Sequence, residues 1–210
     1  EKDAADGRRT YHVAIMPCTA KKMEAARPEF TQEGRPDVDL VITTRELVDM
    51  IREAGIQLTE LEPEAPDLPF GLGSGAAVIY GVTGGVAEAD KSNNALQAIR
   101  VTDLRGDGAI REVNLTVEGQ ELHLAIVNGL SHAKELIADV EAGKRFYHLV
   151  EVMTCQGGCV GGAGQPYGLT AAKKRRGAGL YEADSSAMFK RAEKNPIVTR
   201  LMDDYGPDRC

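Results

Sequence analysis

The chain has 210 residues, of which 42% are hydrophobic and 27% are charged, so it can bury a substantial core and is not a disordered tail. Its net charge of −7 argues against nucleic acid as the main partner, because nucleic-acid binding needs a basic face. No stretch approaches the roughly 18 apolar residues of a membrane-spanning helix. Residues 1–9 lack an apolar signal region, and we therefore expect a cytoplasmic protein.

Strand and helix patterns alternate along the chain, which is typical of an α/β protein. Runs of β-branched and apolar residues predict strands, and amphipathic runs bounded by capping residues, glycine or proline predict helices. In chain order we expect a strand at 11–15, a helix at 18–27, a strand at 38–43, a helix at 45–54 capped by Thr44, a hairpin at 110–117 and 122–127, a helix at 132–141, a strand at 147–152 and a helix at 187–204 broken at Asn195-Pro196. The proline-rich stretch at 58–70 and the basic cluster at 173–176 are expected to be surface loops.

Two cysteine sites share one local design, in which a strand ends and a cysteine follows in the next loop. Cys18 follows the first expected strand, and Cys155 follows the last. Loops at strand ends are well supported and can surround a ligand. Cys159 lies four residues after Cys155, in a run with five glycines between residues 155 and 166. Glycine has no β-carbon, so the backbone there can approach a bulky inorganic group closely.

Three interpretations of these cysteines compete. As ordinary buried thiols they would need no glycine-rich run. A structural zinc site would need four protein ligands, usually in two close pairs, whereas the sequence has one close pair without a nearby histidine. An iron–sulfur cluster suits the thiols and the glycines best, although a cubane normally takes four ligands and Cys210 lies on an unconstrained tail. On that interpretation the chain is one ligand short.

Several motifs resemble those of the iron-only ([FeFe]) hydrogenases. The resemblance is carried by residues 16–24 and 151–159, followed by Gly164-Gln165-Pro166, which are similar to the second and third signature motifs of that family, and by residues 75–86, which are similar to its active-site segment. It extends from about Tyr11 to Tyr205. The resemblance implies an α/β fold with a twisted mixed β-sheet lobe flanked by helices, covering residues 1–166, and a C-terminal helical extension at 167–210.

The resemblance also implies a cofactor, the H-cluster, in which a [4Fe–4S] cubane is joined through a cysteine to a two-iron unit with CO, cyanide and dithiolate ligands. Carried over by motif, the metal ligands are Cys18, Cys155 and Cys159, the catalytic residues are Lys21, Met16 and Met153, and the cofactor-binding residues are Pro17, Tyr80, Gly158 and Gln165. Cys159 would bridge the cubane and the two-iron unit. Lys21 would donate to a cyanide, and the two methionines would pack against the two-iron unit.

The activity that the resemblance implies is the reversible reduction of protons to H₂, with electrons from ferredoxin or an NAD-linked partner subunit. The family's first motif, which brings the fourth cubane cysteine, would lie before Glu1, so we expect an upstream hydrogenase segment to supply it. Tyr80 stands where the family commonly has Phe, and the stretch from Glu88 to Leu104 is shorter than is usual there.

A second hypothesis is a non-catalytic relative, either an iron–sulfur assembly factor or an H₂-sensing regulator on the same scaffold. The presence of Lys21, Met16 and Met153 favours the hydrogenase, since a pure cluster scaffold has no need for them. Tyr80 and the missing first motif favour the alternative.

Overall fold

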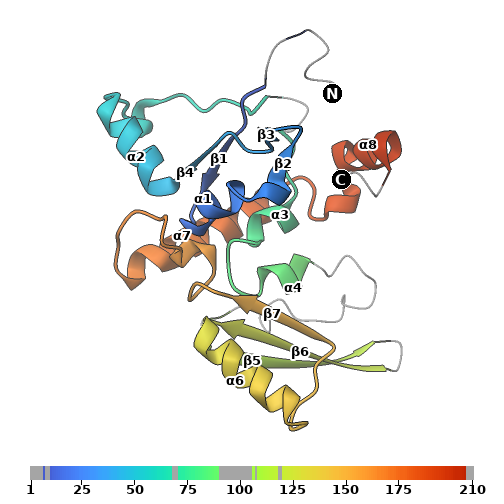
Figure 1. Cartoon of the computed structure of the whole chain (residues 1–210). Coiled ribbons are helices and arrows are strands. Elements are labelled where there is room, and N and C mark those ends of the chain that lie inside the picture. The colour runs from blue at the N-terminus through green and yellow to red at the C-terminus, as the bar shows by residue number, and fades with distance from the viewer. Residues whose placement is uncertain are drawn as a thin grey trace. The chain divides into compact units, whose positions relative to one another are not determined.

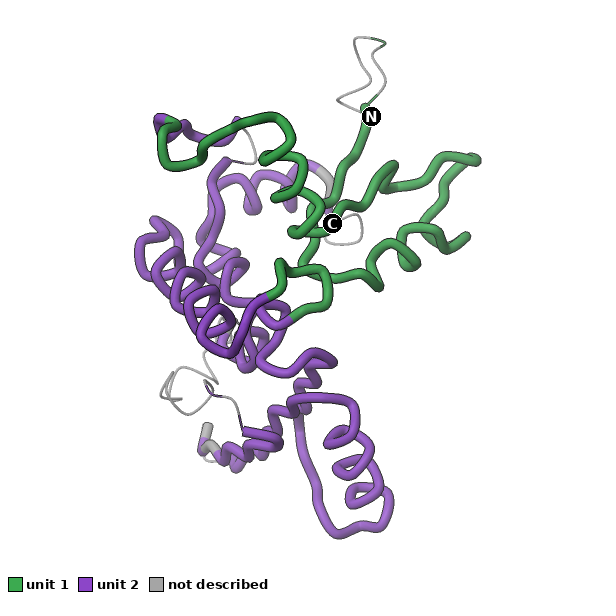
Figure 2. The backbone as a smooth tube through the Cα atoms, turned by 90° about the vertical axis from the view of Figure 1, so that its left-hand side faces the viewer, with its two compact units in different colours: residues 1–61, 162–167 green, residues 62–161, 168–210 purple. Residues whose placement is uncertain are grey.

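A computed structural model describes residues 7, 10–67, 71–89, 106, 108–117 and 120–206 (Figure 1). The chain forms two compact units, one of residues 1–61 and 162–167 and one of residues 62–161 and 168–210 (Figure 2). The expected boundary between residues 166 and 167 stays a prediction. The short stretch expected near residues 88–104 lies mostly outside the described residues, as does Cys210. Among the described residues, no helix has the length and apolar character to cross a membrane.

The first unit is built on two parallel strands. Strand β1 (Val13–Met16) pairs with β4 (Leu40–Thr43), and the register places Met16 opposite Thr43. Parallel strands end at the same edge, so the loops that follow Met16 and Thr43 leave the sheet together. The remaining elements of this unit are α1 (Ala20–Ala25), η1 (Pro28–Phe30), the paired strands β2 (Thr31–Gln32) and β3 (Arg35–Pro36), α2 (Thr44–Glu53) and η2 (Leu58–Glu60).

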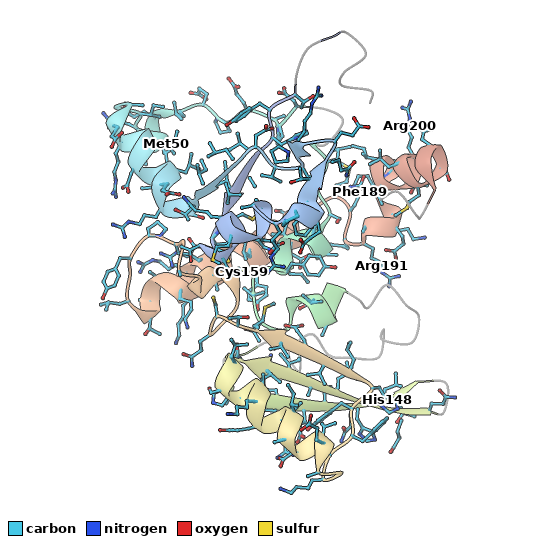
Figure 3. The ribbon with its side chains drawn as sticks, in the orientation of Figure 1. Met50, His148, Cys159, Phe189, Arg191 and Arg200 are labelled. Carbon is cyan, nitrogen blue, oxygen red and sulfur yellow. The ribbon has the colours of Figure 1, made fainter. Side chains whose placement is uncertain are left out.

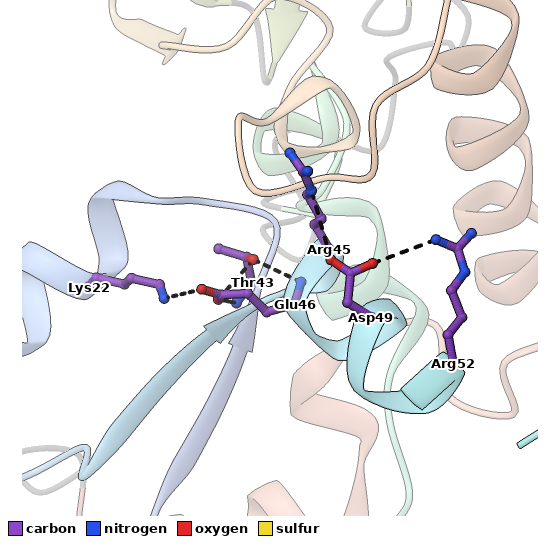
Figure 4. Close-up of polar contacts among 6 residues, drawn as sticks. All are labelled: Lys22, Thr43, Arg45, Glu46, Asp49 and Arg52. Atoms are coloured by element: carbon purple, nitrogen blue, oxygen red, sulfur yellow. Dashed lines mark hydrogen bonds and ion pairs between the residues drawn. The ribbon is translucent and has the colours of Figure 1, made fainter. Parts of the chain in front are cut away.

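Helix α2 begins one residue earlier than the sequence indicates. Thr43, and not Thr44, is the N-cap: its hydroxyl accepts from the backbone N–H of Glu46 at 3.2 Å, and the Glu46 carboxylate accepts from the Thr43 N–H at 2.7 Å (Figure 4). This reciprocal capping box satisfies two backbone donors at the end of β4. The capping-box pattern distinguishes the two threonines in the sequence, because Glu46 stands three residues after Thr43 whereas Leu47 stands three residues after Thr44.

The second unit contains a three-stranded sheet in the order β5-β6-β7. Strand β5 (Ile110–Val117) is antiparallel to β6 (Gln120–Asn128), which is parallel to β7 (Leu149–Met153) across helix α6 (Leu130–Glu141). Alternate residues of β6 serve opposite faces. Ala125 and Val127 pack with α6, whereas Leu124 and Ile126 pack with Ala87 of α4 (Gly85–Ala89). A mixed sheet flanked by helices confirms the expected fold class (Figure 1).

A helical layer completes the second unit. Helix α3 (Gly75–Ile79), helix α7 (Thr170–Ser186) and the short turn η5 (Cys159–Gly161) share an apolar cluster of Ile79, Val82 and Val160, with Leu180 and Tyr181 against it. The basic cluster at 173–176 lies inside α7, so the loop expected there is wrong.

The C-terminal region keeps the predicted break and loses part of the predicted helix. Asn195 caps α8 (Pro196–Tyr205) by accepting from the N–H of Ile197 at 3.0 Å. The preceding stretch contains only the short turn η6 (Ala192–Lys194), so the helix expected from residue 187 begins nine residues too early.

Candidate metal centre

Cys18 lies two residues beyond the end of β1, in a loop that the first unit holds from a distant part of the sequence. The N–H of Gly164 donates to the carbonyl of Pro17 at 3.1 Å, and the carbonyl of Gly164 accepts from the N–H of Arg45 at 3.0 Å. A β-carbon at Gly164 would lie 2.7 Å from the backbone nitrogen of Cys18, which is tighter than real contacts allow. Glycine at position 164 therefore lets the segment of residues 162–167 pack against the Cys18 loop. Gln165 belongs to the same unit as Cys18.

Lys21, on α1, forms an ion pair within its own helix. Its ammonium donates to both carboxylate oxygens of Glu24, at 2.7 and 2.6 Å, and the two side chains are 44% and 39% exposed. An ammonium group has three N–H donors, so one remains for a further acceptor. The expected role of Lys21 toward a cyanide stays a prediction, and so do those of its half-buried neighbours Met16 and Pro17.

Lys22 extends in another direction and links α1 to the start of α2. Its ammonium donates to Glu46 at 2.6 Å (Figure 4). The hydrogen bond from Lys22, followed by those from the Thr43 backbone and hydroxyl, lowers the pKa of Glu46 from 4.5 to about 2. The Glu46 carboxylate that caps α2 therefore stays ionised well below neutral pH and remains paired with Lys22.

In the second unit, a closed turn carries the other two cysteines. Cys155 lies two residues after the end of β7 and is half-buried, and its carbonyl accepts from the N–H of Gly158 at 2.9 Å. Cys159 begins η5 and is exposed; it is labelled in Figure 3. Both cysteine loops thus follow strand ends, as the sequence predicts.

The glycines of this turn contact protein. A β-carbon at Gly158, which has φ +86°, would lie 2.8 Å from the nitrogen of Thr83 and 2.9 Å from the oxygen of Gly81. At Gly157 and Gly161 it would lie 3.0 Å from Cδ of Lys173. The close approach that the sequence assigns to a cofactor is made here by backbone and by a lysine stem. Contact of Gly158 with a cofactor stays a prediction.

Two buried polar side chains support the turn and the segment beside it. Asn128 is 1% exposed, and its Oδ1 accepts from the Thr83 hydroxyl at 2.6 Å and from the N–H of Gly157 at 3.1 Å. Glu151 is 7% exposed and accepts from the N–H groups of Gly84 and Ala87 at 2.6 and 2.8 Å. Glu151 stands at the start of the 151–159 motif, where a carboxylate can anchor the neighbouring backbone through its N–H groups. The sequence gives less sign of Asn128, which is only a polar residue at the end of an apolar strand.

A cavity of about 430 Å³ opens beside the turn. Its lining joins apolar, small and basic side chains, namely Val82, Thr83, Gly106, Gly157, Val160, Lys173, Lys174, Gly177, Ala178 and Tyr181. The second unit also holds the candidate residues Tyr80, half exposed after α3, and Met153, which ends β7. The structure thus supplies a space next to the cysteine turn, and the roles expected for Tyr80 and Met153 stay predictions.

The described residues contain no group of three or more His, Cys, Asp or Glu side chains close enough to hold a metal ion together. Histidines make structural contacts instead. The rings of His123 and His148 stack with centroids 5.6 Å apart, and His132 Nδ1 lies 2.6 Å from the Asn128 carbonyl oxygen (Figure 3 labels His148).

Comparison with known proteins places this arrangement in a family. The family described as "Iron only hydrogenase large subunit, C-terminal domain" matches residues 1–163. The NADP-reducing hydrogenase subunit HndD of Solidesulfovibrio fructosivorans is 40% identical over 92% of this chain and 34% of its own length. The cytosolic iron-sulfur assembly component 3 of Pongo abelii is 39% identical over 74% of this chain and 35% of its own length.

A solved structure of the [FeFe]-hydrogenase HydA1 from Chlamydomonas reinhardtii matches with a TM-score of 0.74 and 35% identity, covering 93% of this chain and 58% of that one. The chain belongs to the family of iron-only hydrogenase C-terminal domains. It spans about a third of the length of the two curated relatives.

The donor chemistry of the chain fits the family's cofactor in kind. A cubane cluster is held by cysteine thiolates, normally four. Cys18, Cys155 and Cys159 are cysteines of this kind, on loops that follow strand ends, and their role as cluster ligands stays a prediction.

Proposed function

We propose that this chain is the C-terminal region of an [FeFe]-hydrogenase catalytic domain and that Cys18, Cys155 and Cys159 supply thiolates to an H-cluster. The observation that carries the proposal is the closed turn with a cysteine at each end, in a chain of the iron-only hydrogenase family. The turn keeps two thiols on one short, supported loop, which is the arrangement a bridged cluster needs.

When bound, the H-cluster would supply the redox chemistry that interconverts two protons, two electrons and H₂. The residues of this chain bind and orient it. Cys18 and Cys155 would ligate the cubane, and Cys159 would bridge to the two-iron unit. Each of these thiols needs to be ionised to act as a ligand, and the metal itself favours that form.

Side chains at the two strand ends would complete the surroundings of the cofactor. The N–H of Lys21 that Glu24 leaves unused would donate to an anionic cyanide. Met16 and Met153, which end β1 and β7, would exclude water with soft, apolar side chains. The other residues proposed to line the cofactor are Pro17, Tyr80, Gly158 and Gln165.

The proposal includes an upstream hydrogenase segment that brings the fourth cubane thiolate. Val13 and Ile15 on β1 are 47% and 50% exposed, and these apolar side chains offer a surface that such a segment could cover. Electrons would come from ferredoxin or a nicotinamide-linked subunit, and the name of the NADP-reducing relative supports the second source. A cytoplasmic location is part of the proposal.

A second candidate is a role in iron–sulfur cluster assembly without hydrogen chemistry. It is favoured by the 39% identity to a cytosolic iron-sulfur assembly component and by Tyr80, which adds a hydroxyl where the hydrogenases commonly have Phe. Such a protein would bind a cubane and no two-iron unit.

Infrared spectroscopy of the anaerobically matured protein, including the upstream segment, distinguishes the two candidates. We expect bands from CO and cyanide ligands, which Cys159→Ala removes. Lys21→Ala should shift the cyanide bands, whereas the matched variant Lys22→Ala should leave them in place, because Lys22 is held by Glu46. A sample with a [4Fe–4S] signal and no such bands would refute the hydrogenase proposal and favour the assembly role.

A further inference from the structure

One peptide group inside the cysteine turn is held at both of its ends. The carbonyl of Gln156 accepts a hydrogen bond from Lys173 Nζ at 2.9 Å. The N–H of Gly157, in the same peptide group, donates to Asn128 Oδ1 at 3.1 Å. Asn128 ends β6, and Lys173 lies in the first turns of α7. Two separate elements therefore fix the orientation of a single peptide plane between the two cysteines.

Without these hydrogen bonds little would hold the peptide group in one orientation, because Gly157 has no β-carbon to restrict its rotation. Gly157 has φ +85°, and glycine enters the left-handed and right-handed regions with similar ease. A turn-over of the peptide would exchange the directions of the Gln156 carbonyl and the Gly157 N–H. It would also break both hydrogen bonds, so Lys173 and Asn128 together fix which way this peptide group faces between the two cysteines.

The alkyl stem of Lys173, like its ammonium group, lies against the turn. A β-carbon at Gly157 would lie 3.0 Å from Lys173 Cδ and 3.3 Å from Nζ, and one at Gly161 would also lie 3.0 Å from Cδ. Two glycines of the turn thus leave room for the alkyl stem, which lies along the backbone while its charged end reaches the carbonyl.

Arg176 acts at the other end of the same turn. It follows Lys173 by three residues and so shares its face of α7. Its Nη1 donates to the carbonyl of Val160 at 3.1 Å, and the N–H of Val160 donates to the carbonyl of Gly81 at 3.0 Å. Both polar groups of the residue after Cys159 are therefore occupied.

We infer that Lys173 and Arg176 are positioning residues that set the shape of the Cys155–Cys159 turn before any metal binds. Hydrogen bonds from charged donors are stronger than neutral ones, and a preformed site loses less freedom when its ligand binds. The inference rests on the proposed function only for the identity of the metal. The shape of the turn does not depend on it.

Amide hydrogen exchange in the metal-free, full-length protein tests the inference. Lys173→Met keeps a stem of similar length and removes the ammonium. We expect the amides of residues 157–161 to exchange about tenfold faster, as for the loss of one charge-assisted hydrogen bond, while the protein still unfolds in one cooperative transition. Lys173→Arg should restore the protection. The matched control is Arg175→Met, which removes the same charge from an exposed neighbour on α7 that donates to neither the Gln156 nor the Val160 carbonyl.

A second readout is the rate at which a chelator removes iron from the reconstituted protein, which should rise in Lys173→Met and stay unchanged in Arg175→Met. Equal exchange in the two variants, or a change spread evenly over β5, β6 and β7, would overturn the inference. Faster exchange confined to the turn in a protein that binds no iron would support the positioning role and contradict the proposed function.

Discussion

Gly164 lies where any side chain would displace the loop that carries Cys18. Its absent β-carbon faces the nitrogen of Cys18 at 2.7 Å and the carbonyl carbon of Pro17 at 2.8 Å, both of them backbone atoms. We expect Gly164→Ala to destabilise the protein by about 1–3 kcal/mol, the usual cost of overpacking. Urea denaturation measures it. Gly73→Ala, placed where nothing lies within 4 Å, is the control and should stay within about 0.5 kcal/mol. Equal stability of the two variants would contradict the close packing at Cys18.

Glu46 gives the first unit an acid-sensitive contact. Lys22 and Thr43 lower its pKa from 4.5 to about 2, so its ionised form contributes stability that is present above pH 4.5. That contribution is lost as the pH falls toward 2, because protonation removes the charge that Lys22 and Thr43 stabilise. Glu46→Gln should therefore reduce the fall in denaturation midpoint between about pH 4.5 and pH 2.

The pH series has a control on the same helix. Glu53, at the other end of α2, makes no hydrogen bond or ion pair with the described residues, so Glu53→Gln should keep the wild-type profile. Added salt should weaken the effect of Glu46, since both it and Lys22 are nearly half exposed. Identical profiles for all three proteins would show that the contact contributes nothing.

At the level of single residues, the positions of Cys18 and Cys155 just after strand ends could be predicted, because each belongs to a local motif beside a strand. Asn128 and the packing of Gly164 could not. Asn128 accepts a hydrogen bond from Gly157, and Gly164 packs against the backbone of Cys18. In both pairs the residues are too far apart in the sequence for a local pattern to indicate the contact. The sequence predicts a close approach at the glycines of the cysteine turn but not their protein partners, because Lys173 and residues 81–83 are brought to them only by folding.

Glu151 connects two elements, β7 and the start of α4, through two buried hydrogen bonds. A carboxylate accepts from both N–H groups, whereas the amide of glutamine accepts on one side and donates on the other. In Glu151→Gln one buried backbone donor loses its acceptor, and we expect a loss of about 1–3 kcal/mol in the free energy of unfolding. Chemical denaturation measures the difference. Glu135→Gln, on the exposed face of α6, should change it by less than about 0.5 kcal/mol. If Glu151→Gln left the free energy of unfolding unchanged, α4 would be held by the packing of Ala87 and not by these hydrogen bonds.

The elements best predicted from the sequence are those with local signals. The hairpin of β5 and β6 has clear alternation, and β1, β4 and β7 are short apolar runs. The sequence does not predict the start of helix α7, because the face of this helix that packs against the rest of the unit is not apolar along its whole length. Lys173, Arg176 and Gly177 occupy that face before Leu180 is reached, and a basic, glycine-containing run resembles a loop when it is considered alone.

At the scale of the whole molecule, the sequence predicted the α/β class and the family but not the division into units. Residues 162–167 belong with residues 1–61, although they follow directly on the cysteine turn of the second unit. The contacts responsible are the hydrogen bonds of Gly164 with Pro17 and Arg45. Such a return is a property of the folded chain, because nothing in the local composition of residues 162–167 indicates it.

Iron content and cluster signals of single cysteine variants test the central claim most directly. In the protein joined to its upstream segment, Cys18→Ser, Cys155→Ser and Cys159→Ser should each lose cluster iron, since a thiolate ligand is removed in every case. Cys210→Ser is the matched control and should retain the wild-type iron and electron paramagnetic resonance signal. Full iron in Cys18→Ser or Cys155→Ser, or loss of iron in Cys210→Ser, would contradict the assignment of the three thiolates.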